Sequence, residues 1–273
     1  MLTELLSASI VLYENNQDDI LTVVNSFLGC GSRAKLFLID NSPTDKLRNI
    51  APSNDRIDYE HNSRNTGYVA HNKAMRKSIE QGFKYHVVLN PDIACEPAIF
   101  SEIVRFMDEN QNIGLLLPKI FYPDGRLQYA CKLLPTPMDF LLRLLLPRSW
   151  IKRRMNSFEL RLSGYDRIMD APYMSGCFMF LRNSTLIEVG LFDERFFMYA
   201  EDIDLSRRIH AHSRAVFFPE VSIVHRHEAR SYKSFRLFWI HFKNVCRYFN
   251  KYGWFFDEDR KRVNGEVLAQ FKS

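Results

Sequence analysis

The feature of this sequence that most restricts its fold is a regular alternation of strand-like and helix-like segments over the first 120 residues. Strands are predicted from short apolar runs and helices from apolar residues on one face. In chain order, they are the strands 7–12, 34–39, 57–61, 85–89 and 114–118 and the helices 18–28, 67–80 and 100–109. Such alternation is typical of βαβ units. We therefore expect an α/β fold with a mostly parallel, Rossmann-like central sheet and flanking helices.

The pattern changes after residue 120. Residues 135–164 are apolar and then strongly basic, and the later segments combine a strand-like run at 173–181, a helix at about 203–211, short strands at 216–218 and 222–224, and an aromatic and basic helix at 234–252. We divide the chain into a main domain at 1–230, with halves at 1–120 and 121–230, and a C-terminal helical extension at 231–273.

Cysteine usage and charge exclude several classes of protein. The 5 cysteines are odd in number and show no CxxC spacing, so a disulfide framework and a structural zinc site are disfavoured and a reducing cytoplasm is expected. We find no signal peptide and no apolar run of about 18 residues that predicts a membrane span. Basic residues concentrate at 143–161 and 226–262, which are also rich in large apolar side chains. This combination favours an anionic surface as partner.

Polar turns follow three of the predicted strands, at 13–15, 40–42 and 90–92. In open α/β sheets, ligands bind beyond the carboxyl ends of the strands. The carboxylate of Asp40 can accept the imide N–H of uracil or thymine, and that of Asp92 can hold Mg²⁺ or Mn²⁺ against a diphosphate. Ordinary Asx turns that end a strand would explain the same residues.

Two further segments carry polar groups suited to a phosphate or a metal. Asn65 and Gly67 precede a helix, whose N-terminus and close backbone approach suit a pyrophosphate, although an Asn cap with a turn glycine is the alternative. His225 follows a strand-like run and can complete a metal site with Asp92. A histidine satisfied within the core is the alternative there.

The most unusual segment is an aromatic block that ends in Glu201, Asp202 and Asp204. Carboxylates at the start of a helix can simply cap it and oppose its positive end. Apolar surroundings, however, raise the pKa of a carboxylate, which suits a general base. We favour a catalytic role for this cluster because three carboxylates fall within four positions.

In their order along the chain, these segments resemble the family 2 glycosyltransferases. The matching pieces are Ser9-Ile-Val-Leu-Tyr13, Ile39-Asp-Asn-Ser42, Asn65-x-Gly67 with Asn72, Leu89-Asn-Pro-Asp92, Gly176-Cys-Phe-Met179, Gly190-x-Phe-Asp193, Phe197-Met-Tyr-x-Glu201-Asp202-x-Asp204-Leu205 and Val224-His225. The resemblance covers roughly residues 5–235. It is closest to the bacterial rhamnosyltransferase branch, which acts in O-antigen (lipopolysaccharide) and other surface-polysaccharide assembly.

The resemblance implies a GT-A fold in which residues 1–120 bind the nucleotide sugar and residues 121–230 bind the acceptor. It assigns Asp202 as the catalytic base with Glu201 beside it. The donor residues it implies are Tyr13, Asp40, Asn41, Asn65, Gly67 and Asn90. The acceptor residues it implies are Gly176, Cys177 and Asp204. Asp92 matches the last carboxylate of the DXD motif, but Asn90 replaces the first one, so His225 becomes the second candidate ligand for a divalent metal (Mg²⁺ or Mn²⁺).

The expected activity is inverting transfer of L-rhamnose from dTDP-rhamnose to a lipid-diphosphate-linked saccharide. The enzyme is expected in the cytoplasm, peripherally on the inner face of the cell membrane. A UDP-sugar donor with galactofuranose, N-acetylglucosamine or glucose is the first alternative, because donor choice rests on pocket shape. A non-catalytic GT-A-like binding subunit is the second. Nucleic acid is not expected as a partner, since the positive charge lies among Phe, Leu and Trp and no recognition motif is present.

Overall fold

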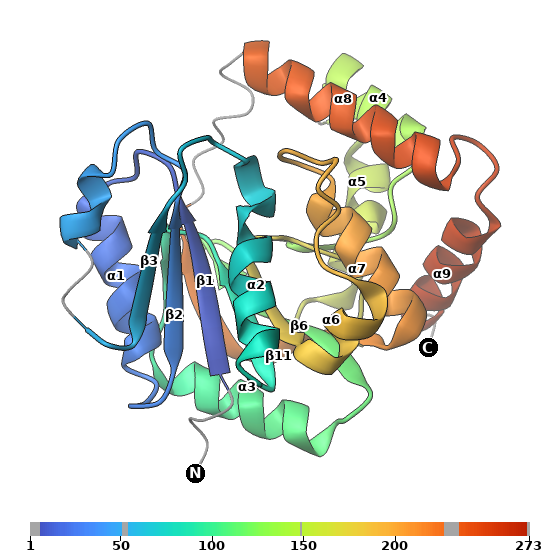
Figure 1. The fold of residues 1–273 in the computed structure, drawn as a ribbon. Coiled ribbons are helices and arrows are strands. Elements are labelled where there is room, and N and C mark those ends of the chain that lie inside the picture. The colour runs from blue at the N-terminus through green and yellow to red at the C-terminus, as the bar shows by residue number, and fades with distance from the viewer. Residues whose placement is uncertain (1–5, 51–53, 148, 227–234, 272–273) are drawn as a thin grey trace.

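The structure is a computed structural model that describes residues 6–50, 54–147, 149–226 and 235–271. A nine-stranded sheet with helices on both faces forms its centre (Figure 1). The strands are β1 (Leu6–Leu12), β2 (Lys35–Asp40), β3 (Ile57–His61), β4 (Tyr85–Leu89), β5 (Ile93–Ala94), β6 (Ile113–Phe121), β7 (Cys131–Lys132), β8 (Met169–Asp170), β9 (Tyr173–Met174), β10 (Phe178–Arg182) and β11 (Arg214–His225).

The helices are α1 (Gln17–Leu28), α2 (His71–Glu80), α3 (Ala98–Glu109), α4 (Pro137–Leu145), α5 (Lys152–Phe158), α6 (Asn183–Val189), α7 (Glu201–His212), α8 (Phe235–Tyr252) and α9 (Glu258–Ala269), with 3-10 turns η1 (Lys46–Ile50), η2 (Gly67–Ala70) and η3 (Arg161–Ser163). The helices α2, α6 and α7 cover one face of the sheet, and α1 and α3 cover the other. Among the described residues, no helix is long and apolar enough to cross a membrane.

The sheet has the strand order β3-β2-β1-β4-β10-β6-β11-β5, and β8 pairs with β11 outside this path. The strands β3, β2, β1 and β4 are mutually parallel, as are β6 and β11, whereas β10 runs antiparallel between β4 and β6. A separate two-stranded sheet pairs β7 with β9. The predicted α/β fold of GT-A type, with a mostly parallel sheet and C-terminal helices, is confirmed.

Burial on both faces explains why the strands are apolar throughout. All residues of β4 are buried, and so are all those of β10, because helices cover both sides of the sheet. His86 of β4 is polar, yet it is satisfied inside the core by Ser7 at 2.8 Å and Ser9 at 2.8 Å. Burial also lowers the pKa of His86 to about 3, so the ring is neutral.

Two predicted segments differ from the observed elements. The strand expected at 173–181 is divided into β9 and β10 by a turn at 175–177, and the two strands join different sheets. The strands expected at 216–218 and 222–224 form one strand, β11, with an irregularity between Phe218 and Ser222. The first of these differences matters for the site, because the turn carries Gly176 and Cys177.

The C-terminal helices pack on the main body. Three buried residues of α8, Val245, Tyr248 and Phe249, form a cluster with Phe196, Ala200 and Ile203. These last three residues belong to the segment that ends in the predicted catalytic carboxylates. The helix α8 therefore supports that segment directly.

Candidate active site

The turns predicted to carry chemistry meet at one edge of the sheet. Because β1, β2, β4 and β11 all run in the same direction, their carboxyl ends lie at that edge. The antiparallel strand β10 starts there instead of ending there. Its preceding turn is joined to the end of β4, because the Asn90 N–H donates to the Cys177 carbonyl at 2.9 Å. Sheet topology thus brings Gly176 and Cys177 to the edge where the polar turns meet.

A carboxylate and an imidazole form the candidate metal centre. Asp92 Oδ1 lies 3.4 Å from His225 Nε2, and Asn90 Nδ2 lies 3.4 Å from the same nitrogen. His225 Nδ1 is 2.8 Å from Gln128 Oε1, which fixes the orientation of the ring. His225 is buried, whereas Asp92 is partly exposed. The two residues predicted as ligands from distant parts of the sequence therefore lie together.

The ionisation of His225 depends on its burial and on its neighbours. Burial lowers the pKa of His225, but the neighbouring Cys177 sulfur and the Asp92 carboxylate raise it more, and the resulting pKa is about 10. The described residues contain no group of three or more His, Cys, Asp or Glu side chains able to hold a metal. The donor set of this centre fits a divalent ion that takes few ligands from the protein and the others from a diphosphate and water.

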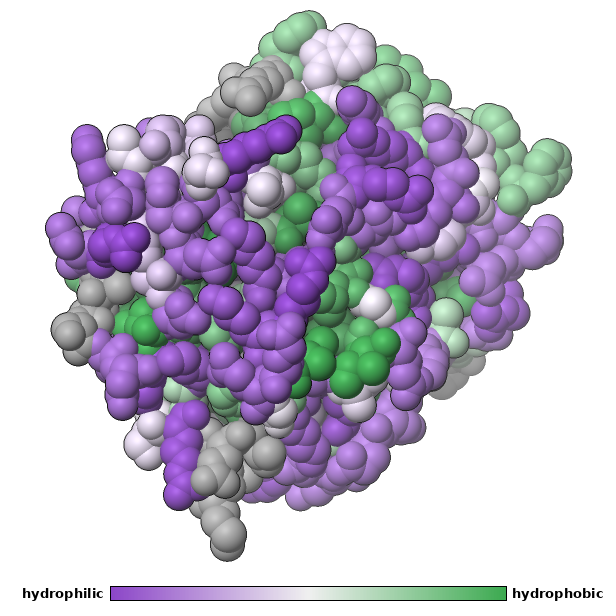
Figure 2. All heavy atoms as spheres, viewed as in Figure 1, coloured by the Kyte–Doolittle hydropathy of each residue, from purple (hydrophilic) through white to green (hydrophobic). Residues whose placement is uncertain are grey.

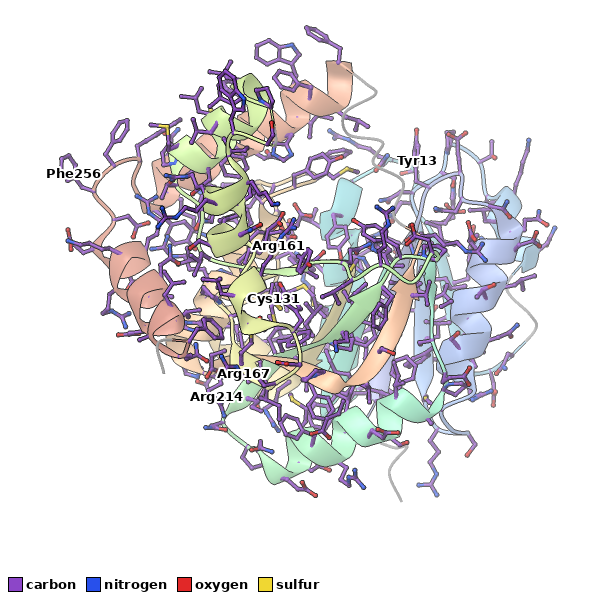
Figure 3. All side chains as sticks on the ribbon, turned by 180° about the vertical axis from the view of Figure 1, so that it is seen from behind. Tyr13, Cys131, Arg161, Arg167, Arg214 and Phe256 are labelled. Carbon is purple, nitrogen blue, oxygen red and sulfur yellow. The ribbon has the colours of Figure 1, made fainter. Side chains whose placement is uncertain are left out.

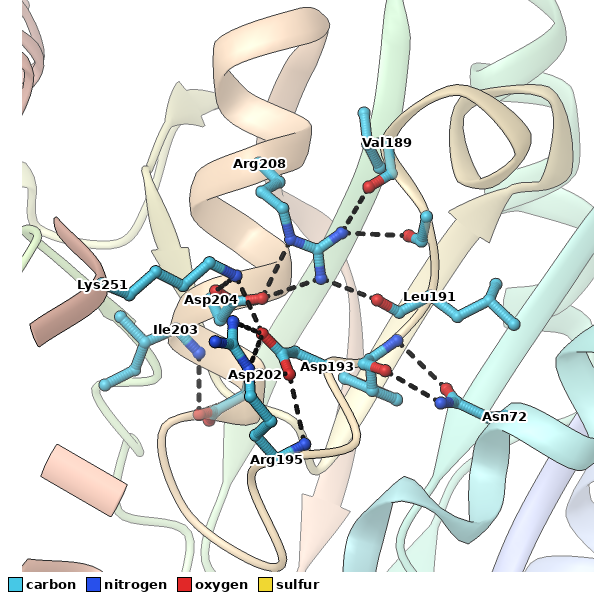
Figure 4. Close-up of polar contacts among 12 residues, drawn as sticks. Asn72, Val189, Leu191, Asp193, Arg195, Asp202, Ile203, Asp204, Arg208 and Lys251 are labelled. Carbon is cyan, nitrogen blue, oxygen red and sulfur yellow. Dashed lines mark hydrogen bonds and ion pairs between the residues drawn. The ribbon is translucent and has the colours of Figure 1, made fainter. Parts of the chain in front are cut away.

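The candidate base lies in the first turn of α7. Tyr199 (φ 68°) and Ala200 (φ 72°) both adopt left-handed backbone conformations, which cost non-glycine residues about 1–3 kcal/mol each and cluster at functional sites. They reverse the chain so that α7 begins at Glu201. Asp202 Oδ2 accepts a hydrogen bond from Gly176 N at 3.1 Å. Asp202 Oδ1 accepts one from Ile203 N at 2.9 Å (Figure 4).

Burial dominates the ionisation of both carboxylates. It raises the pKa of Asp202, and the Lys132 charge and backbone hydrogen bonds only partly oppose this. Burial, and then the Asp202 charge, raise the pKa of Glu201 well above its ordinary value. Glu201 Oε2 has no hydrogen-bond partner within the described part of the chain. A carboxylate with a raised pKa is better suited to accept a proton near neutral pH.

The segment before the base is held from several sides (Figure 4). Asn72 of α2 makes two hydrogen bonds to the backbone of Phe192, at 2.8 and 3.0 Å. The Arg208 guanidinium donates to three consecutive carbonyls, those of Val189, Gly190 and Leu191. These contacts fix the entry to the loop that carries Asp202.

Asp204, predicted as an acceptor contact, is enclosed by side chains of the protein. It is fully buried. Its oxygens accept hydrogen bonds from Arg208 at 2.9 Å, Lys251 at 2.5 Å and Tyr252 at 2.7 Å. Since both partners at 251–252 belong to α8, Asp204 ties α7 to α8, and its contact with an acceptor stays a prediction.

Tyr68 is the residue that the sequence interpretation missed. Its hydroxyl donates to the Gly176 carbonyl, and its backbone N–H donates to the Phe197 carbonyl at 2.8 Å. Burial, and then the charges of Glu201 and Asp202, raise the pKa of the Tyr68 hydroxyl well above its ordinary value. Its position directly after the Asn-x-Gly turn is the signal that could have identified it.

The residues predicted to bind the donor lie around the same edge of the sheet, and their side chains differ in how far they are exposed to solvent. Tyr13 is exposed and lies beyond the end of β1 (Figure 3). Asn41 Nδ2 donates to the Gly67 carbonyl at 3.0 Å, and Asn65 Oδ1 accepts from Gly67 N at 2.8 Å, so both asparagines shape the glycine turn. Their contact with a donor stays a prediction.

Asp40 is enclosed by its own neighbours. It is fully buried, Oδ1 accepts from Ser42 N at 2.8 Å, and Oδ2 accepts from the Tyr59 hydroxyl at 2.6 Å. Contact between this carboxylate and a base therefore requires Tyr59 or the turn at 40–42 to move. The predicted hydrogen bond from Asp40 to a base stays a prediction.

The sheet, with its shared edge of polar turns and its antiparallel strand β10, defines the GT-A class of nucleotide-sugar transferases. Two solved structures share the fold. GalNAc-T7 with UDP, GalNAc and Mn²⁺ superposes with a TM-score of 0.58 at 17% identity, over 81% of this chain and 43% of that one. Mannosyltransferase PcManGT from Pyrobaculum calidifontis, in complex with GDP-Man and Mn²⁺, superposes with a TM-score of 0.56 at 14% identity, over 97% of this chain and 74% of that one.

Sequence comparison then identifies the family. Residues 7–186 match the profile of Glycosyl transferase family 2, and the chain belongs to this family, as its sequence motifs predicted. N-acetylglucosaminyl-diphospho-decaprenol L-rhamnosyltransferase of Mycobacterium tuberculosis is 29% identical over 148 residues, 53% of this chain and 47% of that protein. The chain thus spans about half the length of that relative. Rhamnosyltransferase WbbL of Escherichia coli K12 is 25% identical over 252 residues, 88% of this chain and 90% of WbbL.

Proposed function

We propose that this protein is an inverting, metal-dependent glycosyltransferase in which Asp202 is the catalytic base. The observation that carries the proposal is the placement of Asp202 at the start of α7. Its carboxylate accepts a hydrogen bond from Gly176 at 3.1 Å, and Cys177 is joined to Asn90 at the donor edge. A proton acceptor therefore lies beside the edge where GT-A proteins bind nucleotide sugars.

In the proposed reaction, Asp202 removes the proton from an acceptor hydroxyl. The acceptor oxygen attacks the anomeric carbon of the donor, the bond from that carbon to the nucleoside diphosphate breaks, and a single displacement inverts the configuration. Asp92 and His225 would hold a divalent metal, which, when bound, neutralises charge on the leaving diphosphate. The backbone N–H groups at the start of η2 and α2 supply positive potential near the same edge.

We further propose a division of labour along the chain. Residues 1–120 bind the donor through Tyr13, Asn41, Asn65, Gly67 and Asn90, and residues 121–230 bind the acceptor near Gly176 and Cys177. Residues 231–273 form the C-terminal extension. The position of these donor residues around the carboxyl ends of β1, β2 and β4 supports this division.

For the donor, we propose dTDP-L-rhamnose, and for the acceptor a lipid-diphosphate-linked saccharide. The names of the two relatives support rhamnose, and the name of the Mycobacterium relative supports a polyprenyl diphosphate acceptor. The protein would then act in O-antigen or other surface-polysaccharide assembly at the inner face of the cell membrane. Galactofuranose, N-acetylglucosamine and glucose remain the alternative sugars.

The test is a panel of dTDP-, UDP- and GDP-sugars with a lipid-linked acceptor, run with and without EDTA. We expect turnover of dTDP-rhamnose that EDTA abolishes and added Mn²⁺ or Mg²⁺ restores. Turnover of UDP-sugars alone would overturn the proposed donor, and an undiminished rate in EDTA would overturn the metal requirement.

Asp202→Asn separates catalysis from binding. The amide keeps the shape of the side chain but cannot take a proton, so kcat should fall about 10²–10⁴-fold while donor affinity is retained. The second candidate function, a non-catalytic binding subunit, is favoured by one observation, the presence of Asn90 where the DXD motif has a carboxylate. Donor binding without turnover in the parent protein would support that alternative.

A further inference from the structure

The outer face of α8 carries a stripe of exposed aromatic side chains. Phe235, Phe238, Trp239 and Phe242 recur at helical spacing, and the exposed fractions of Phe235, Trp239 and Phe242 are 77%, 51% and 47%. Their rings contact one another, with the centroids of Trp239 and Phe242 5.6 Å apart and those of Phe238 and Phe242 6.5 Å apart. Figure 2 shows hydrophobic residues gathered over the end of the molecule where α8 lies.

The neighbouring helix α4 extends this apolar surface. Phe140 of α4 packs against His241 and Phe249 of α8, with ring centroids 5.7 and 5.9 Å apart. The helices lie side by side in Figure 1. On α4, the exposed apolar side chains are Met138, Leu141 and Leu145. We call the exposed apolar side chains of the two helices the α4–α8 face.

The loop after α8 adds two further apolar side chains. Phe255 and Phe256 are exposed, and Figure 3 shows Phe256 extending away from the body of the protein. Such an exposed group of large apolar side chains marks an interaction surface, because isolated proteins seldom leave so many together in water.

The charge around the α4–α8 face is positive. The described residues of 137–158 and 235–256 include one carboxylate, Asp139, which is buried and accepts a hydrogen bond from Arg154 at 2.6 Å. Lys152 and Arg153 of α5 and Lys243 of α8 are exposed. Within these ranges no carboxylate is exposed, and an aromatic stripe accompanied by lysine and arginine complements an anionic lipid surface. Contact between two copies through this face would instead bring their positive charges together.

The inner face of the same helix holds the loop that precedes the base. Asn244 Nδ2 donates to the Met198 carbonyl at 2.7 Å, and Arg247 Nη1 donates to the Arg195 carbonyl at 2.5 Å. Lys251 bonds both Asp193 and Asp204. The helix therefore has the catalytic loop on one side and the exposed aromatic stripe on the other.

We propose that the α4–α8 face docks on an anionic lipid bilayer, with α8 lying in the interface, and that α8 thereby places the catalytic loop one helix away from an acceptor anchored in that bilayer. The acceptor part of this inference rests on the proposed function, whereas the docking itself does not. The stripe runs from Phe235 to Phe242, so the N-terminal half of α8 would meet the interface, whereas the apolar side chains of its C-terminal half are buried in the protein.

The test measures binding of the full-length protein to vesicles of phosphatidylcholine with and without phosphatidylglycerol. The parent should bind the anionic vesicles, and salt should weaken this binding. Replacing the stripe, in the triple variant Phe235→Ser, Trp239→Ser and Phe242→Ser, should weaken binding about tenfold or more. The matched control is Leu21→Ser with Ile187→Ser, which removes exposed apolar side chains from α1 and α6 and should bind as the parent does.

Activity assays separate the docking from the proposed function. Transfer to a lipid-linked acceptor in vesicles should fall with the loss of binding in the triple variant, while transfer to a short-chain, water-soluble acceptor should stay within about twofold of the parent. Equal vesicle binding by the parent and the triple variant would overturn the docking. It would also be overturned if the parent sedimented as a stable dimer and the triple variant as a monomer. If the parent binds vesicles but transfers sugar to neither acceptor, the docking stands and the proposed function fails.

Discussion

At the scale of single residues, the hydroxyl of Tyr68 is linked to the candidate base through one residue, Gly176. It donates to the Gly176 carbonyl, and the Gly176 N–H donates to Asp202. A Cβ atom at Gly176 would lie 3.0 Å from the Tyr68 hydroxyl oxygen and 3.3 Å from Asp202 Cβ, so glycine allows the three residues to approach closely. We infer that Tyr68 positions the Asp202 carboxylate without touching the reacting atoms.

Replacing Tyr68 with Phe should lower kcat about tenfold and leave KM for the donor nearly unchanged, because one hydrogen bond that orients the base is lost while the ring packing remains. The acid limb of the kcat–pH profile should also move, since Gly176 N–H would no longer be fixed against Asp202. Tyr85→Phe is the matched control, because its hydroxyl binds Asp108 at 2.6 Å far from the site. A similar kcat for both variants and the parent would exclude a positioning role.

Glu201 gives a prediction about stability and pH. The pKa of Glu201 is raised in the folded protein, so the folded state holds this proton at pH values where the unfolded chain has released it. Stability of the parent should therefore fall as pH rises from the ordinary glutamate pKa through the raised one. Glu201→Gln cannot ionise and lacks this loss. In urea unfolding, the free energy of unfolding of the variant minus that of the parent should increase by about 1 kcal/mol or more between about pH 5 and about pH 8. Parallel pH dependences would contradict the prediction.

At the scale of elements, the site depends on contact between two loops from different parts of the chain. Gly67 has a φ of +75°, and a Cβ atom there would lie 2.0 Å from the Phe197 carbonyl oxygen. The turn before α2 therefore packs directly on the loop before α7, and the Tyr68 N–H bonds the same carbonyl. Glycine is needed here both for its left-handed backbone and for this close approach.

Gly67→Ala should lower both stability and kcat/KM, the latter about tenfold or more, because the loop at 196–200 must move away from the turn. Gly82→Ala is a matched control. Gly82 has nearly the same φ, +76°, but no atom lies within 4 Å of its added Cβ. Gly82→Ala should lower the free energy of unfolding, measured in urea, by about 1 kcal/mol and leave activity unchanged. Equal losses of activity in the two variants would show that backbone strain alone, and not loop contact, is responsible.

Local sequence patterns predicted the helices and strands that end at polar turns. The bounds of the other elements depend on contacts between residues distant in sequence. The strand expected at 85–89 matches β4 because Asn90 and Pro91 end it. The break between β9 and β10 depends on tertiary hydrogen bonds such as Ser175 N to the Ala130 carbonyl, at 3.0 Å, which no local pattern reveals. The helix α9 lies within the predicted helical extension, but its bounds were not predicted, because its sequence is mostly polar and buries few apolar side chains besides Val263 and Val267.

The same distinction applies to the candidate site. The meeting of Asp92 with His225 followed from strand ends that share one edge of a parallel sheet. The role of Asp204 could not be predicted, because its partner Lys251 comes from a helix 47 positions further along the chain. A carboxylate cluster in the sequence therefore identified the loop but did not separate the candidate base from a structural residue.

At the scale of the whole molecule, the C-terminal extension is joined to the main body by a buried ion pair. The Arg207 guanidinium of α7 makes two hydrogen bonds to Asp257, each at 2.7 Å. The exposed fractions of the two side chains are 6% and 2%. Asp257 also caps α9 by accepting from Arg260 N at 2.9 Å. Arg207 also donates to the Tyr248 hydroxyl at 3.3 Å, so its hydrogen-bond partners come from the extension, and these contacts couple the extension to the main domain.

Asp257→Ala should reduce the free energy of unfolding by about 3–5 kcal/mol, because it leaves the Arg207 charge buried without a partner and removes a helix cap. Asp259→Ala provides the comparison, since Asp259 pairs with Arg262 at 2.7 Å on the surface, where both side chains are about half exposed. Asp259→Ala should reduce the free energy of unfolding by less than about 1 kcal/mol. Both are measured by urea unfolding followed through near- and far-ultraviolet circular dichroism. If Asp257→Ala instead produced a separate early transition and left the main transition unchanged, residues 231–273 would fold as an independent unit.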